Sequence, residues 1–354
     1  MGRRGQDFGV ERLRDEVRAG LRAVVGEPLR HGELRLLGLA DHDVQRLLRK
    51  GVLQRAHGRY IDGAMDENLA AVRCALAAHP QSVVSHQTAA GLRGLRVWAD
   101  ESPGSEPVID TVWLTCAPGP SRRNQKRDDV VLRRAGLPPV DLQRFRNLPM
   151  TSAARTTVDL ARELPFREAI VTVDHALATA VSRQDLDLVL RRQRHWPGVQ
   201  SAHRAVAFGD PRSESALESI ARVLFEEAGR PAPVLQAQFS DGGRWMAERV
   251  DFWWPQFRTV VEADGLAKFE APTTKQRRRI LRRAFERDHR LADRDLELVH
   301  FGWEDAVNQP EQLAERLRAA FARGTRRTGD APIWRTTDPT DPILWPMPLE
   351  AAGW

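Results

Sequence analysis

Residues 249–268 constrain this chain most strongly, because three carboxylates are set there into two apolar, strand-like segments. Asp251 belongs to the first segment, and Glu262 and Asp264 belong to the second. Charges embedded in apolar strands need an oppositely charged partner or a metal ion. Carboxylate oxygens are the ligands that Mg²⁺ prefers, so the pattern predicts a site for Mg²⁺ or Mn²⁺. The alternative is an ordinary hairpin whose carboxylates are solvated.

The spacing of the carboxylates predicts how they meet. Glu262 and Asp264 are two residues apart, and side chains alternate along a strand, so both project from one face. If Pro255 and Gln256 form a hairpin turn, Glu262 lies diagonally across from Asp251, with about 7–8 Å between the Cα atoms. Both carboxylates can then reach one ion.

Lysine is rare in this chain, and its rarity makes Lys268 a candidate catalytic residue. Of the 54 basic residues, the lysines are Lys50, Lys126, Lys268 and Lys275. Arginine fills the positions that need only positive charge, so Lys268, which follows the carboxylates, is predicted to have a specific role. An ammonium group can lose its proton or stabilise charge that develops on a phosphate. A solvent-exposed surface lysine is the alternative.

Positive charge is concentrated after these residues. The formal net charge is +6, and residues 273–294 alone hold nine basic and three acidic residues. A basic helix beside a metal site would attract a polyanion, and nucleic acid is the polyanion that we expect. The predicted contacts to its backbone are Arg283, Arg287 and Arg290. The alternative is a solvated helix face.

Several classes of protein are disfavoured by the sequence. The two cysteines, Cys74 and Cys116, lack the spacing of a zinc site or a disulfide framework. The glycine patterns that bind ATP or dinucleotides do not occur. The chain has no apolar core of a signal peptide and no run of transmembrane length, so a cytoplasmic location is expected.

The N-terminal part has the pattern of a winged helix. Residues 34–61 are predicted to form two helices and a short hairpin with His57 and Gly58 in its turn. The second helix and the wing would then carry the DNA-contacting residues Arg46, Arg49, Lys50, Arg55 and Arg59. A small helical domain with solvated basic residues is the alternative, and such units also bind protein partners.

Residues 213–323 are predicted to form elements in the order α, β, β, β, α, β, α, which is typical of a mixed sheet flanked by helices. Glu218 lies in the first helix, three residues after Ser215. This spacing is that of a capping box, in which the glutamate bonds to the start of its own helix. A role as a metal ligand beside the downstream carboxylates remains equally open.

These motifs resemble the very-short-patch-repair-like branch of PD-(D/E)xK endonucleases over residues 213–323. The likeness is carried by Ser213 to Glu218, Pro233 to Gln236, Arg249 to Phe252, Val260 to Gly265 and the Arg287-Asp288 pair. The resemblance implies a Mg²⁺ site formed by Glu218, Asp251, Glu262 and Asp264. Asp264 stands where the broader superfamily has lysine, Lys268 stands where this branch often has histidine, and His300 stands where relatives tend to have arginine.

The front half is similar to AbiEi-type antitoxins over residues 34–190, in the runs that begin at Ser85 and Thr151. The expected fold is an α+β multidomain protein. Its parts are a winged helix (1–65), a mixed α/β middle region (66–205), a restriction-endonuclease-like domain (213–323) and a poorly ordered tail rich in proline and tryptophan (324–354).

Two functional hypotheses follow. The first is a metal-dependent endonuclease that cleaves DNA in phage defence or DNA repair. The second is a non-catalytic, antitoxin-like DNA-binding regulator with a degenerate nuclease fold. In either case the expected partners are nucleic acid, most simply DNA, and a toxin or another defence protein.

Overall fold

Helices and β-sheets occur in both units of this α+β protein. A computed structural model describes residues 27–98, 111–119, 124–126, 129–241, 243–264, 274–330 and 332–336. The first unit comprises residues 1–94 and 106–156, and the second comprises residues 95–105 and 157–354. Within the described ranges, no helix is both long and apolar enough to cross a membrane.

The first unit begins with two helices and a hairpin: α2 (His31–Leu36), α3 (Asp41–Arg49), β1 (Leu53–Ala56) and β2 (Arg59–Asp62). The hairpin turn lies at His57 and Gly58, as expected, and Ala56 pairs with Arg59. Both turn residues have positive φ, 47° for His57 and 70° for Gly58. This conformation matches the twist of a two-residue hairpin, and glycine adopts it without steric cost.

The rest of the first unit is a six-stranded sheet with the strand order β5-β6-β4-β3-β8-β7. Its elements are α4 (Glu67–Ala78), β3 (Ser82–Val84), α5 (His86–Leu92), β4 (Val112–Cys116), β5 (Gln125–Lys126), β6 (Val130–Arg134), η1 (Pro139–Asp141), β7 (Leu142–Phe145) and β8 (Leu148–Thr151). Helix α6 (Ala153–Glu163) continues the chain into the second unit.

Before residue 210, the second unit contains the end of α6, α7 (Phe166–Thr179), α8 (Arg183–Arg192) and α9 (Val199–Phe208). They were expected in the middle region, but they group with the C-terminal sheet. The reason is packing, because Val171 of α7 lies in the same hydrophobic core as Ile220 and Leu224 of α10 (Ala216–Glu227), the helix that leads into the C-terminal sheet.

The second unit contains a five-stranded sheet with the order β12-β11-β10-β9-β13. Neighbouring strands are antiparallel except β11 and β12, which are parallel. Its elements are α10 (Ala216–Glu227), β9 (Val234–Asp241), β10 (Arg244–Trp254), η2 (Pro255–Phe257), β11 (Thr259–Ala263), α11 (Thr274–Ala292), β12 (Glu297–Phe301), η4 (Glu304–Asn308), α12 (Pro310–Gly324) and β13 (Trp334–Thr336). From α10 to α12, helices and strands follow the expected order.

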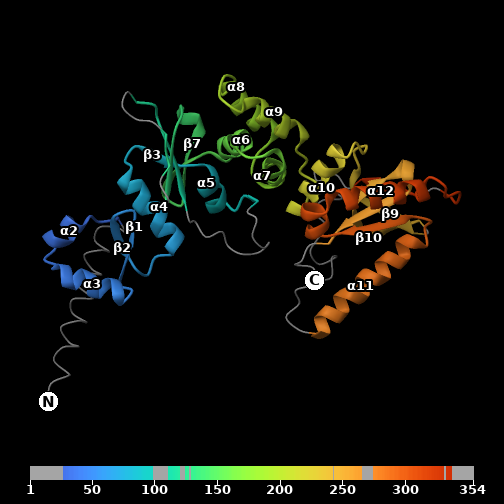
Figure 1. Cartoon of the computed structure of the whole chain (residues 1–354), viewed down its shortest axis with the longest axis horizontal. Helices are drawn as coiled ribbons and strands as arrows, with labels where there is room; N and C mark the ends of the chain where they lie inside the picture. Colours follow the sequence, from blue (N-terminus) through green and yellow to red (C-terminus); the bar gives the residue numbers. More distant parts are fainter. Residues whose placement is uncertain are drawn as a thin grey trace, which may run out of the picture. The chain divides into compact units, whose positions relative to one another are not determined.

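Helices cover both faces of this sheet. Figure 1 shows α11 on one face and α10 and α12 on the other. On the α10 side, Phe225 packs edge-on against Phe252 and Trp254, with 5.1 Å between ring centroids in each pair. On the α11 side, Leu291 packs in a second core with Trp253. Burial on both faces explains why the end of β10, from Phe252 to Trp254, and most of β11 are apolar.

One part of the C-terminal tail, residues 324–354, is ordered, although the sequence predicts poor order there. Residues 334–336 form β13, an edge strand that pairs with β9 through Trp334 and Phe239. This strand is hard to predict from its residues, because three are too few to show an alternating pattern. Residues 337–354 lie outside the described part of the chain.

Candidate functional site

Asp251 and Glu262 lie in the two neighbouring strands of the β10–β11 hairpin. The paired register runs from Trp254 with Thr259 to Phe252 with Val261, and Asp251 and Glu262 are the residues that adjoin this last pair. The expected turn at Pro255 and Gln256 is wrong by two residues in register, because the connection spans residues 255–258. In the corrected register both residues adjoin the Phe252–Val261 pair, which differs from the predicted diagonal arrangement. Oδ2 of Asp251 also accepts a hydrogen bond of 2.8 Å from the backbone N–H of Ala263.

A paired irregularity in β9 and β10 sets the direction of Asp251. Val250 and Phe252 are two residues apart but lie in different hydrophobic cores, on opposite faces of the sheet. Regular alternation therefore breaks at Asp251. The residue opposite it in β9 is Gln236, whose φ is 53°. A left-handed conformation in a residue other than glycine is unfavourable and is found preferentially at functional sites.

Gln236 connects this irregularity to Glu218 of α10. Its side-chain Nε2 donates to Oε2 of Glu218 at 3.1 Å. Glu218 also accepts from the backbone N–H of Glu214 at 2.9 Å and from the hydroxyl of Ser215 at 2.7 Å. Ser215 in turn caps the helix by accepting from the backbone N–H of Glu218 at 3.1 Å. Ser215 therefore caps the helix, while the Glu218 carboxyl group binds the N–H of Glu214, one residue before the N-cap position of the expected capping box.

The same carboxyl group lies close to Asp251. Burial, together with the negative charge of Asp251, raises the pKa of Glu218 to about 8, although the hydrogen bonds from Ser215 and Glu214 oppose this shift. Capping does not exclude a second role, because a carboxylate has more acceptor sites than these bonds use. Glu218, Asp251 and Glu262 are called the carboxylate cluster below.

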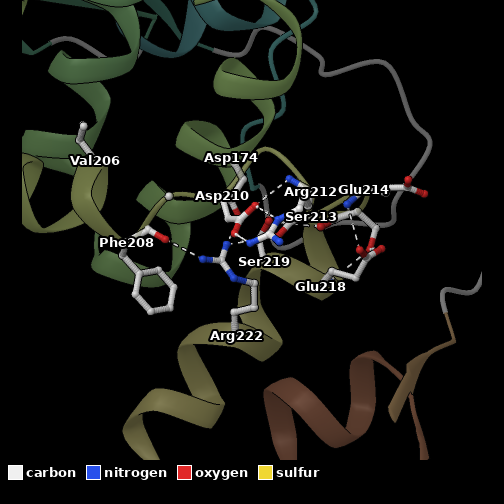
Figure 2. Close-up of polar contacts among 12 residues, drawn as sticks. Asp174, Val206, Phe208, Asp210, Arg212, Ser213, Glu214, Glu218, Ser219 and Arg222 are labelled. Atoms are coloured by element: carbon white, nitrogen blue, oxygen red, sulfur yellow. Dashed lines mark hydrogen bonds and ion pairs between the residues drawn. The ribbon is translucent and has the colours of Figure 1, made fainter. Parts of the chain in front are cut away.

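A buried ion pair fixes the start of α10. One turn after Glu218, Arg222 donates to Oδ2 of Asp174 in α7 at 2.7 Å and to the carbonyl of Phe208 at 2.6 Å. The other oxygen of Asp174 accepts from the backbone N–H of Asp210 at 2.7 Å. Figure 2 shows these contacts beside Glu218. The network fixes the loop that leads into α10, and so it fixes the position of Glu218.

Replacing Arg222 by methionine is expected to lower the free energy of unfolding by about 3 kcal/mol, because Asp174 would be left buried without its cation. The side chains of Arg222 and Asp174 are only 9% and 1% exposed. Urea denaturation measures the change. The matched control is Arg282→Met, which removes an exposed pair with Glu286 and should cost less than about 0.5 kcal/mol. Equal losses in the two variants would contradict the structural role of Arg222.

Glu262 is fully buried and lies against an arginine of α11. Nη2 of Arg287 is 2.9 Å from Oε2 of Glu262, and the two side chains are 19% and 0% exposed. Burial opposes the charged guanidinium, but Glu262, Asp251 and Asp288 outweigh it and raise the pKa of Arg287. Arg287 was expected to contact a nucleic-acid backbone, yet here it faces the carboxylate cluster.

Asp264 belongs to a second, adjoining network. Oδ2 of Asp264 is 2.9 Å from Nδ1 of His300, and Nε2 of His300 is 3.2 Å from Oδ2 of Asp288. The hydrogen bond that His300 donates to Asp264 is the main reason that the pKa of His300 is raised, although burial opposes the shift. His300 is thus held between two carboxylates. Its β12 position pairs with Glu262 of β11, a neighbourhood that sequence spacing does not reveal.

Other predicted residues are placed as follows. Lys268 and the side chain of Arg283 lie outside the described residues. Arg290 is in α11 and partly exposed. In the first unit, Arg49, Lys50 and Arg55 are exposed, Arg46 pairs with Asp43 at 2.9 Å, and Arg59 donates to the carbonyl of Ala77 at 2.7 Å. Arg59 is therefore committed to the end of α4, which differs from its expected role on the wing.

The donor atoms of the carboxylate cluster suit a divalent cation, but their arrangement in this structure is not that of a metal site. Its donors are hard carboxylate oxygens from α10, β10 and β11, which suits Mg²⁺ or Mn²⁺. However, no group of three or more His, Cys, Asp or Glu side chains within the described ranges is arranged to hold a metal ion. The guanidinium of Arg287 instead lies against Glu262.

Comparisons with known proteins give relatives of undefined function. No family model matches the chain. The uncharacterized proteins MT2308 and Rv2248, from two strains of Mycobacterium tuberculosis, are 31% identical to it over 177 residues, which is 50% of the chain and 63% of each relative. The chain thus matches less than two thirds of the length of these relatives.

One solved structure has a weak likeness to the chain. The crystal structure of the RV2827C protein from Mycobacterium tuberculosis has a TM-score of 0.39 and 17% identity, covering 63% of the chain and 83% of that protein. A likeness at this level carries no argument about fold or function.

Proposed function

We propose that the second unit is a Mg²⁺- or Mn²⁺-dependent nuclease that cleaves phosphodiester bonds, with DNA as its substrate. The observation that carries this proposal is the carboxylate cluster. The helix α10 and the hairpin strands β10 and β11 contribute Glu218, Asp251 and Glu262 to one region, and the proximity of Asp251 contributes to the raised pKa of Glu218. Mutually repelling carboxylates are what a divalent cation stabilises.

Each residue of the site would have a distinct role in cleavage. Asp251 and Glu262 would hold the cation directly, and Glu218 would hold it directly or through a water. A bound Mg²⁺ polarises the scissile phosphate and lowers the pKa of an attacking water. Asp264 would orient His300 at the border of the cluster. Lys268 would position or deprotonate the water, as its place in the sequence suggests.

Nucleic acid is favoured as substrate by charge and by the first unit. Helix α11 is strongly basic and borders the cluster through Arg287 and Asp288. The order of α2, α3 and the hairpin β1–β2 is the order expected for a winged helix, and such a module would bind DNA separately from the second unit. With the resemblances to repair endonucleases and antitoxins, this combination favours a role in phage defence or DNA repair.

Plasmid nicking tests the proposal. The full chain is incubated with supercoiled DNA and Mg²⁺ or Mn²⁺, with and without a chelator. The double variant Asp251→Ala plus Glu262→Ala serves as the comparison. Metal-dependent nicking by the wild type alone is expected. Equal nicking by both proteins would remove the assignment of these carboxylates.

A second candidate is a non-catalytic, antitoxin-like DNA-binding regulator. It is favoured by the ion pair between Arg287 and Glu262, which already neutralises part of the cluster. Calorimetry and gel shifts discriminate between the two functions. Sequence-specific DNA binding without any Asp251-dependent binding of Mn²⁺ would favour the regulator.

A further inference from the structure

We propose that Arg287 is a built-in counter-cation of the carboxylate cluster and that a divalent cation binds by replacing it. This inference rests on the proposed nuclease function and extends it to a residue on α11. In the observed ion pair, one arginine stabilises carboxylates that would otherwise be buried together. The same arginine would compete with the metal for Glu262.

The need for a counter-cation follows from burial. Glu262 lies in β11, between β10 and β12, and its side chain has no exposed surface. An ionised carboxylate at this depth requires a cation or several hydrogen bonds to be tolerated. Arg287 supplies positive charge at 2.9 Å from Oε2 of Glu262. The guanidinium is itself mostly shielded from water, so the attraction is weakly screened.

A single arginine does not balance the charge of this region. Asp251 and Asp288 also act electrostatically on Arg287, in addition to Glu262. Among the described residues, Arg287 thus faces three carboxylates, of which Asp288 also contacts His300. A divalent cation that bridges Asp251 and Glu262 would neutralise more of this charge. It would also repel the guanidinium at short range, so the two cations are expected to exclude each other.

The position of Arg287 makes such an exchange feasible. It projects from an outer helix onto the sheet and reaches Glu262 with a long, flexible side chain. Moving it requires rotation of that side chain and no break in the sheet. Asp288, the next residue of α11, is bound to His300, which would keep the helix in place during the exchange.

The test is Mn²⁺ binding by the full-length variant Arg287→Gln, measured by calorimetry and by the rise of the melting temperature with Mn²⁺ concentration. We expect at least tenfold tighter binding of Mn²⁺ than in the wild type, because the competitor is gone. Without metal this variant should melt at a lower temperature, and Mn²⁺ should stabilise it more than it stabilises the wild type.

Two controls complete the experiment. Arg323→Gln removes a helix arginine that bonds a different strand carboxylate, Glu297, at 2.8 Å, and it should leave Mn²⁺ binding unchanged. The double variant Arg287→Gln plus Glu262→Gln should recover metal-free stability but lose the gain in Mn²⁺ affinity. This double variant keeps the proposal testable if the single variant is too unstable to purify.

The outcomes separate this inference from the nuclease proposal. If Arg287→Gln binds Mn²⁺ no more tightly than the wild type, while the wild type nicks DNA in an Asp251-dependent way, the exchange is wrong and the nuclease stands. Weaker binding by the variant would likewise overturn the exchange and make Arg287 a support for Glu262. If neither protein binds Mn²⁺, both proposals fall.

Discussion

Replacing Asp251 by asparagine is expected to reduce metal-dependent cleavage of DNA by about 100- to 1000-fold, the size of effect seen when one electrostatic contact to a transition state is lost. The new amide side chain would keep an oxygen that can accept the hydrogen bond from the backbone of Ala263. The hairpin should therefore stay intact while the negative charge is removed. Initial rates of plasmid nicking at saturating Mg²⁺ measure the loss.

Two further variants test whether the loss is specific to the carboxylate cluster. Glu262→Gln should show a loss of similar size, because both carboxylates would hold the same ion. Glu311→Gln neutralises an exposed carboxylate in the first turn of α12 and should nick DNA at the wild-type rate. Full activity in Asp251→Asn, with the control also active, would show that cleavage does not use the carboxylate cluster.

The second large effect is a dependence of stability on pH that originates in Glu218. Its folded-state pKa of about 8 lies above the ordinary value of 4.5, because the charged form is buried close to Asp251. A group with a raised pKa stabilises the folded state below its unfolded pKa, and this stability is lost as the pH rises through the folded pKa. The metal-free protein should therefore become less stable between pH 5 and pH 8.5.

The expected size of this loss is large for a single group. Each unit of pKa difference corresponds to about 1.4 kcal/mol, so Glu218 contributes a loss of roughly 4 kcal/mol over this range. Urea denaturation in the presence of a chelator, at pH 5 and at pH 8.5, measures it. Glu218→Gln has no proton to lose and should remove this part of the pH dependence. Parallel pH profiles for the two proteins would contradict the assignment to Glu218.

Added Mg²⁺ should oppose the same loss at pH 8.5. A cation at the cluster favours the ionised carboxyl group and binds the folded state, so stability should rise with its concentration. The effect should be absent in Asp251→Asn. These measurements detect metal binding without relying on any substrate.

Local patterns predicted much of the fold. The helix at α11 is visible in its charge and length, and the strands at β10 and β11 are visible as apolar runs. The hairpin turn at His57 and Gly58 was predicted correctly, because a glycine between two strand-like runs is a strong local signal for a turn. The predicted register of β10 and β11 was wrong, because the length of the connection between these strands depends on the backbone conformation of residues 255–258, which the residue pattern does not reveal.

The candidate site was predicted only in part, because its partners are distant in sequence. Asp251 and Glu262 are close along the chain, and their proximity follows from a hairpin. The contact of Arg287 with Glu262 depends instead on how a helix packs on the sheet. The bridge from Asp264 to His300 depends on the parallel pairing of β11 and β12. Neither of these relations leaves a periodic signal in the sequence.

The strand β13 has a consequence for the solution behaviour of the protein. It covers the outer side of β9, so the backbone groups there are bonded within the chain and cannot recruit a strand from another molecule. A protein shortened after Gly324 would expose this side of β9, where an unpaired strand invites intermolecular association. The three residues 334–336 thus move this edge of the sheet from the long strand β9 to a very short strand, which offers fewer backbone groups for pairing with another molecule.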